Sequence, residues 1–93
     1  MIRIEALEAV WSTHPEAEGP MLAWFNTVEA ARWNDPADVK QSYRSADILK
    51  NSRVVFNVNS FRIVAKVKYR TKVVFIRFAG THAEYDEIDA NAV

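Results

Sequence analysis

Two side chains that can exchange protons lie close together near the end of the sequence. Residues 81–86 read Thr-His-Ala-Glu-Tyr-Asp, and the first four have the form of a helix capping box. A helical turn that begins there would put His82 and Tyr85 on one side of it. Histidine titrates near neutrality and suits acid–base catalysis. A phenol could share that task only beside cations that favour its ionised form; otherwise Tyr85 positions a substrate or stacks on a base.

The segment before this motif is rich in cations. Residues 51–80 contain seven Lys or Arg and no acid, while residues 1–50 carry five basic and eight acidic side chains and residues 81–93 carry four acidic ones. The net charge of zero therefore hides a strong separation of charge. A field of one sign attracts anions such as nucleic acids.

Acid–base groups beside cations suit RNA cleavage by the adjacent 2′-hydroxyl. A base takes the hydroxyl proton, an acid protonates the leaving 5′-oxygen, and cations stabilise the charge on the phosphate. Structural explanations stay open, because the cationic strands could be a solvated outer face and His82 and Tyr85 a helix start packed on the sheet. The residues alone thus predict an RNA- or phosphate-binding domain and leave catalysis undecided.

Three strands rich in β-branched and aromatic residues precede the motif, at residues 54–58, 61–69 and 73–78. Asn59-Ser60 and Arg70-Thr71 separate them, and each pair has the length of a tight hairpin loop. An antiparallel meander is therefore expected.

Two-residue loops would pair Val58 with Phe61 and Tyr69 with Lys72, which sorts the side chains onto two faces. One face is almost purely apolar: Val54, Phe56, Val58, Phe61, Ile63, Ala65, Val67, Tyr69, Val74, Ile76 and Phe78. The opposite face carries four cations among apolar residues: Val55, Asn57, Arg62, Val64, Lys66, Lys68, Val73, Phe75 and Arg77. We expect one face to form the core and the other a cationic surface that holds phosphate.

Two or three helices are predicted before the strands, and they would cover the apolar face. Apolar spacing and capping signals place them at about Glu5 to Ser12, from a capping box at Thr13 to Arg32 or Trp33, and from a cap at Asp35 to about Tyr43. A short edge strand at residues 1–4 and a connector at residues 45–52 complete the chain. The expected fold is α+β: these helices on one face of a small antiparallel meander, a short C-terminal helical turn, and residues 1–93 as one domain.

Composition argues against several classes of protein. The chain has no cysteine, which removes disulfides and thiolate chemistry, and it has no run long enough to span a membrane. A cytoplasmic protein without cofactor or metal is expected, since His14 has no further ligands at metal spacing. Trp11, Trp24 and Trp33 are expected in the core or in partner contacts rather than in base stacking.

The run from Val73 to Ala90, which includes Gly-Thr-His-Ala-Glu-Tyr-Asp, resembles the C-terminal signature of HigB-type toxins in the RelE/ParE superfamily of bacterial toxin–antitoxin systems. The similarity continues upstream in residues 23–25, 35–40, 53–58 and 61–64. This resemblance implies a RelE/ParE-like fold and a metal-independent endoribonuclease that cuts mRNA in the ribosomal A site. It also implies a HigA-like antitoxin with a helix-turn-helix domain as partner.

The resemblance also implies roles for particular residues. The catalytic positions would be Arg62, Arg77, His82 and Tyr85, and the RNA- or phosphate-binding positions Asn57, Lys66 and Lys68. Two other functions remain as alternatives: a ParE-like inhibitor of DNA gyrase on the same fold, and a non-catalytic module that binds RNA or protein.

Overall fold

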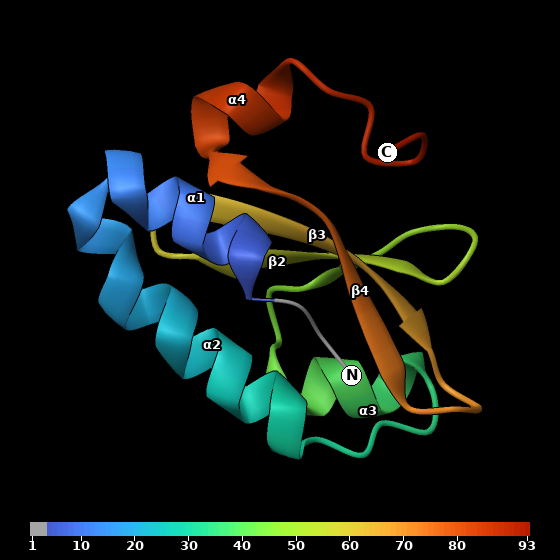
Figure 1. Ribbon diagram of the computed structural model, residues 1–93. Helices are drawn as coiled ribbons and strands as arrows, with labels where there is room; N and C mark the ends of the chain where they lie inside the picture. The colour runs from blue at the N-terminus through green and yellow to red at the C-terminus, as the bar shows by residue number, and fades with distance from the viewer. Residues whose placement is uncertain (1–3) are drawn as a thin grey trace.

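Helices lie along one face of an antiparallel sheet, and the C-terminal segment lies over the other (Figure 1). The computed structural model describes residues 4–93. The elements in chain order are α1 (Glu5–Thr13), the 3-10 helix η1 (Pro15–Ala17), α2 (Glu18–Ala30), α3 (Pro36–Ser42), β1 (Asp47–Ile48), β2 (Arg53–Val58), β3 (Phe61–Lys68), β4 (Val73–Thr81) and α4 (His82–Asp86). The predicted α+β class is confirmed, including the helical turn at the C-terminal end.

The sheet has the order β1-β2-β3-β4, and every neighbouring pair is antiparallel. Val58 pairs with Phe61 across the two-residue loop, as predicted. Asn59 in this loop has φ 55°, a left-handed conformation that asparagine tolerates better than most residues. Lys68 pairs with Val73 in the expected register, but β3 ends at Lys68 rather than at Tyr69, so residues 69–72 form a four-residue loop.

The main core lies between the sheet and the helices, and Phe56 is at its centre. The Phe56 ring centroid lies 5.2 Å from that of Trp24, 5.3 Å from that of Tyr43 and 6.0 Å from that of Trp33. Trp24 and Trp33 are buried, and Trp11 packs half-buried against the same cluster. The prediction that the tryptophans belong to the helical layer and its core is therefore confirmed.

A β-bulge in β4 changes which residues face the core. The pairing of β3 with β4 shifts between Val64 and Ala65, because Ala65 faces Ile76 while Val64 faces Phe78, so Arg77 is the extra residue. Phe78 consequently lies on the outer face, and Ala79 packs against the main core in its place. Strict alternation had placed Phe78 in the core, and that prediction was wrong.

The helical layer also differs from its prediction at two boundaries. Thr13 is the last residue of α1 and makes no cap, and the chain passes through η1 into α2, which ends at Ala30 rather than at Arg32 or Trp33. The cap at Asp35 is confirmed, because its Oδ1 accepts a hydrogen bond of 3.0 Å from the Asp38 amide. The edge strand predicted at residues 1–4 lies largely outside the described residues, and Ile4 is the N-cap of α1.

The connector before the sheet contains a strand that the sequence did not reveal. Asp47 pairs with Val55 and Ile48 with Val54, which adds β1 to the edge of the meander. Two residues are too few to show an alternating pattern, so the prediction of a plain connector was wrong at this point. None of the helices within residues 4–93 has the length and apolarity needed to cross a membrane.

Candidate functional site

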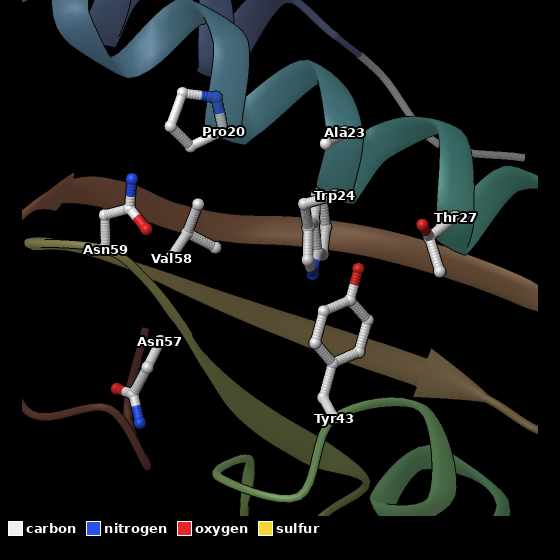
Figure 2. Close-up of a pocket in the computed structure, with 8 residues that line it drawn as sticks. All are labelled: Pro20, Ala23, Trp24, Thr27, Tyr43, Asn57, Val58 and Asn59. Atoms are coloured by element: carbon white, nitrogen blue, oxygen red, sulfur yellow. The ribbon is translucent and has the colours of Figure 1, made fainter.

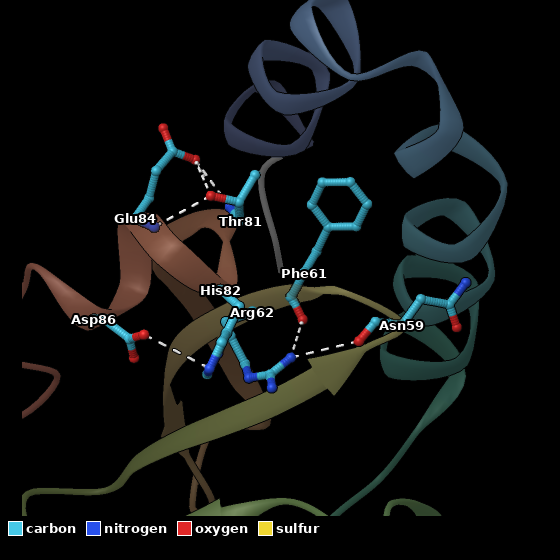
Figure 3. A network of polar contacts seen from close by, with 7 residues as sticks. All are labelled: Asn59, Phe61, Arg62, Thr81, His82, Glu84 and Asp86. Atoms are coloured by element: carbon cyan, nitrogen blue, oxygen red, sulfur yellow. Dashed lines mark hydrogen bonds and ion pairs between the residues drawn. The ribbon is translucent and has the colours of Figure 1, made fainter.

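A capping box begins α4 directly after β4. The Thr81 hydroxyl accepts a hydrogen bond of 3.1 Å from the Glu84 amide, and the Glu84 Oε1 accepts one of 2.8 Å from the Thr81 amide (Figure 3). The Thr81 amide and hydroxyl hold the pKa of Glu84 below its ordinary value, since they stabilise the carboxylate. The predicted capping box is confirmed, and it makes His82 the first residue of α4.

The sheet brings α4 to the loop between β2 and β3. The His82 amide donates a hydrogen bond of 3.1 Å to the Ser60 carbonyl, and Arg62 pairs with Gly80 across the β3–β4 ladder. Arg62 of β3 and His82 of α4 therefore lie at the same end of the sheet. Both belong to the residues for which the resemblance implies a catalytic role.

Gly80 leaves the room that the capping box needs. A Cβ at this position would lie 2.7 Å from Glu84 Oε1 and 3.0 Å from Phe78 Cζ. Glu84 could swing away, but the Thr81 amide would then lose its acceptor. We expect Gly80→Ala to lower the free energy of unfolding by about 1 kcal/mol, the usual cost of a lost cap. Urea denaturation measures this change.

Gly19→Ala is the matched control for that experiment. Apart from its chain neighbours and its own helix backbone, no atom lies within 4 Å of the Cβ that it would add. In α2 alanine is favoured over glycine by up to about 1 kcal/mol, while the following Pro20 disfavours a Cβ on a helical residue. These two effects oppose each other, so we expect this variant to stay close to the wild-type stability. A Gly80→Ala protein of unchanged stability would show that the cap tolerates the extra carbon.

The imidazole of His82 is open to solvent and has two neighbours on α4. The side chain is 56 % exposed, and its Nε2 lies 3.6 Å from Asp86 Oδ2. The Tyr85 ring is nearly parallel to the imidazole at a centroid distance of 6.5 Å. The prediction that His82 and Tyr85 share one side of the turn is confirmed. Asp86 was missed, although a carboxylate four residues after a histidine in a helix is a visible signal.

The guanidinium of Arg62 is held by the hairpin that precedes it. Its Nη1 donates to the Phe61 carbonyl at 3.0 Å and more weakly to the Asn59 carbonyl at 3.4 Å (Figure 3). Within residues 4–93 no carboxylate forms an ion pair with it. The other guanidinium nitrogens are therefore free to donate to an anion.

The C-terminal segment covers the middle of the outer face. Val55, Val64 and Ala90 are buried there in a small second core, which Phe78 and Tyr85 extend. Leu49, Ile88 and Val93 pack against the same cluster. The Phe78 and Tyr85 rings lie 6.5 Å apart. The outer face is thus not the continuous cationic surface that was predicted, because an apolar strip divides it.

Two arginines are turned toward this covering segment. Arg53 donates to the Val93 carbonyl from Nε at 2.9 Å and from Nη2 at 2.7 Å, and Arg77 approaches the same oxygen at 3.5 Å. Arg77 is thus directed toward the tail, whereas the sequence had grouped it with His82. Its catalytic role was a hypothesis from resemblance, and no hydrogen bond or ion pair links its side chain to α4 in the described structure.

Lys66 and Lys68 lie beyond the covered strip. Lys66 follows Arg62 by four residues along β3, which corresponds to about 13 Å. The buried Val64 and the covering C-terminal segment lie between the two positions. The predicted phosphate ligands therefore form two groups, one at each end of the outer face.

Asn57 belongs to the end that carries His82, since it pairs with Arg62. Its side-chain amide donates a hydrogen bond of 3.0 Å to the Ser45 carbonyl.

Asn57 also lines a groove of about 290 Å³ between α2 and the edge of β2 (Figure 2). Burial raises the pKa of Tyr43, which faces this groove. The buried Nε1 of Trp24 points toward Tyr43 there and has no hydrogen-bond partner within residues 4–93. The acid–base residues of α4 do not line this groove.

His14 lies at the C-terminal end of α1. Its Nδ1 is 3.7 Å from Glu16 Oε1, and its ring centroid is 5.8 Å from that of Phe61. Among residues 4–93, no three His, Asp or Glu side chains are placed to share a metal ion.

The family is decided by comparison with known proteins. A family model for HigB toxins, described as the RelE-like toxic component of a toxin–antitoxin system, matches residues 17–88. The chain belongs to the HigB toxin family. The match includes α2 to α4, and so it includes the hairpin of Arg62 and the capped helix of His82 in this HigB-family toxin.

Curated relatives agree with this membership. The HigB-family chain is 31 % identical over 90 residues to the mRNA interferase toxin HigB of Escherichia coli (strain K12). The aligned region covers 92 % of this chain and 86 % of the relative. The mRNA interferases HigB of Escherichia coli O157:H7 and Shigella flexneri match with the same identity and coverage.

Proposed function

We propose that this toxin is an mRNA endoribonuclease that cuts messages on the ribosome and so stops translation. The arrangement at one end of the sheet carries the proposal: an exposed imidazole on the first residue of a capped helix, with Arg62 on the strand that pairs with β4. Similarity to curated mRNA interferases supports the choice of mRNA as substrate.

The proposed reaction is attack by the 2′-hydroxyl on the adjacent phosphorus. The 2′-oxygen–phosphorus bond forms while the bond to the 5′-oxygen breaks, which leaves a 2′,3′-cyclic phosphate and a 5′-hydroxyl end. Arg62 would donate hydrogen bonds to the non-bridging oxygens, on which charge grows in the transition state. His82 would take the 2′-hydroxyl proton or supply a proton to the leaving 5′-oxygen, with the Asp86 carboxylate 3.6 Å from its Nε2.

Tyr85 has a positioning role in this proposal. Its ring centroid lies 6.5 Å from that of His82 and 6.5 Å from that of Phe78. A ring in this place can limit the motion of the imidazole or stack on a base beside the scissile phosphate. Arg77 and Asn57 would contact the RNA next to that phosphate, and Lys66 and Lys68 would contact it further along the strand.

Partners follow from membership in a toxin–antitoxin family. We infer an antitoxin that neutralises this toxin, with a HigA-like helix-turn-helix protein as the specific partner and the ribosomal A site as the place of cutting. On this proposal residues 1–93 act as one cytoplasmic domain. No metal ion is needed for the reaction, because the proton transfers and the charge stabilisation come from side chains.

Cell-free translation tests the proposed function. Purified protein is added to a translation reaction, and new 5′ ends of the message are mapped by primer extension, with a parallel reaction that lacks ribosomes. We expect discrete new ends only where ribosomes are present. Intact message and normal translation would contradict the proposal, and a supercoiling assay with DNA gyrase would then test the ParE-like alternative.

A further inference from the structure

An aromatic side chain stands exposed at the end of the outer face that is opposite to His82. Phe75 is 43 % exposed, and within residues 4–93 only Ile48, at 39 %, is another large hydrophobic residue exposed to this degree. Phe75 pairs with Lys66 across the β3–β4 ladder, so both side chains leave the sheet on the same face. The Lys68 ammonium lies 5.5 Å from the centre of the Phe75 ring. A ring and two cations therefore form one small patch.

The strands that carry this patch contain charges of a single sign. Residues 51–80 contain no acid, and neither lysine takes part in an ion pair within residues 4–93. Arg53 pairs with Lys66 across the β2–β3 ladder and extends the row of cations across the sheet. Its guanidinium also donates two hydrogen bonds to the Val93 carbonyl. Such a surface is complementary to a polyanion and not to an apolar partner that offers few hydrogen-bond acceptors.

A solvent-exposed ring flanked by cations has the chemistry that recognises unpaired nucleotides. Bases stack on aromatic faces in single-stranded RNA complexes, while Lys and Arg contact the flanking phosphates. A protein partner would instead require a larger contiguous apolar area. Ile48 cannot supply that area, because β1 and β4 are the opposite edges of the sheet.

We propose that Phe75 is a stacking platform for an unpaired RNA base whose neighbouring phosphates bind Lys66 and Lys68. The proposal rests on the proposed function, since it takes RNA as the ligand of this face. Phe75 precedes Thr81 by six residues of β4, roughly 20 Å of extended strand, so the stacked base lies well away from the scissile phosphate. The platform holds the RNA strand and takes no part in the bond-breaking step.

The Lys68 ammonium lies over the Phe75 ring, 5.5 Å from its centre. A cation over an aromatic ring is attracted by the negative face of its π system. An incoming base can replace the ammonium on the ring, and the freed charge can then bind the phosphate of that nucleotide.

Phe75→Leu tests the platform, with Phe75→Trp as the rescue and Ile48→Ala as the control for loss of an exposed apolar side chain. Cleavage of a message on programmed ribosomes is measured over a range of substrate concentration. We expect Phe75→Leu to raise KM about tenfold with kcat unchanged, because it removes one base–aromatic stack. Phe75→Trp and Ile48→Ala are expected to keep the wild-type KM. Thermal melts check that all variants fold.

A second measurement identifies the source of the base. The probe is a 2′-O-methyl oligoribonucleotide, which lacks the attacking hydroxyl and is not cut. It carries 2-aminopurine, whose fluorescence changes when the base stacks. Weaker binding by Phe75→Leu supports a base of the message. Unchanged binding together with a raised KM supports a base of ribosomal RNA.

Two results separate failure of this inference from failure of the proposed function. If Phe75→Leu cuts the message with the wild-type KM and binds the oligonucleotide with the wild-type affinity, the stacking platform is overturned and the proposed nuclease function is not. Absence of cleavage by the wild type would overturn the nuclease. The oligonucleotide would then decide the platform by itself, with equal affinities of wild type and Phe75→Leu overturning it.

Discussion

Replacement of His82 by alanine is expected to reduce message cleavage by about 10²–10⁴-fold, the usual contribution of a positioned acid or base. The imidazole is 56 % exposed at the first residue of α4, and the capping bonds beside it are made by Thr81 and Glu84. Its removal should therefore leave the fold intact. Single-turnover cleavage on programmed ribosomes, with circular dichroism of the variant, measures both effects.

His14→Ala is the matched control, since the chain contains two histidines. Both imidazoles lie near a carboxylate, with Nδ1 of His14 3.7 Å from Glu16 and Nε2 of His82 3.6 Å from Asp86. Only His82 lies on α4, so we expect His14→Ala to keep full activity. Cleavage at the wild-type rate by the His82→Ala variant would move the proton transfers to Tyr85 or to a group of the ribosome.

Loss of the Arg62 guanidinium is expected to have an effect nearly as large. In Arg62→Ala the rate of the cleavage step should fall by about 10²–10³-fold, as when one donor to a developing oxyanion is removed. The carbonyls of Phe61 and Asn59 hold this group in place before the substrate arrives, which reduces the cost of ordering it in the complex. A quench-flow measurement of one turnover reports the cleavage step directly.

Arg70→Ala removes the same charge from the same basic segment and serves as the control. Arg70 is exposed in the loop between β3 and β4, at the other end of β3 from Arg62. We expect its loss to alter the salt dependence of binding and not the rate of cleavage. Arg62→Lys should be intermediate, because an ammonium keeps the charge but loses the planar fork. If Arg62→Ala and Arg70→Ala behave alike, Arg62 serves general RNA attraction only.

The candidate site is the meeting point of two local structures. One is the β2–β3 hairpin, which turns the Arg62 guanidinium back onto its own carbonyls, and the other is the capped start of α4. The bond from the His82 amide to the Ser60 carbonyl joins them. Each local structure is encoded in a few consecutive residues, which explains why both could be predicted before the structure was known.

Local chemistry and periodicity were sufficient for much of the fold. The capping box at Thr81, the cap at Asp35 and the pairing of Val58 with Phe61 depend on neighbouring residues or on a two-residue loop. A slip of one residue would have exposed an apolar face, so the alternation of β2 and β3 also determined their register. The closeness of His82 and Tyr85 followed from their spacing alone.

The tertiary structure decided what lies on the outer face, because that depends on segments distant in sequence. Alternation along β4 predicted Phe78 in the core, and packing reversed this: Ala79 meets the main core, while Phe78 meets Tyr85 and the C-terminal segment. That segment buries the strip between Arg62 and Lys66. Periodicity shows which face of a strand is apolar, but it does not show what covers the other face. The sequence therefore determined the sheet, and only the packing of the C-terminal segment divided the cations of the sheet into two groups.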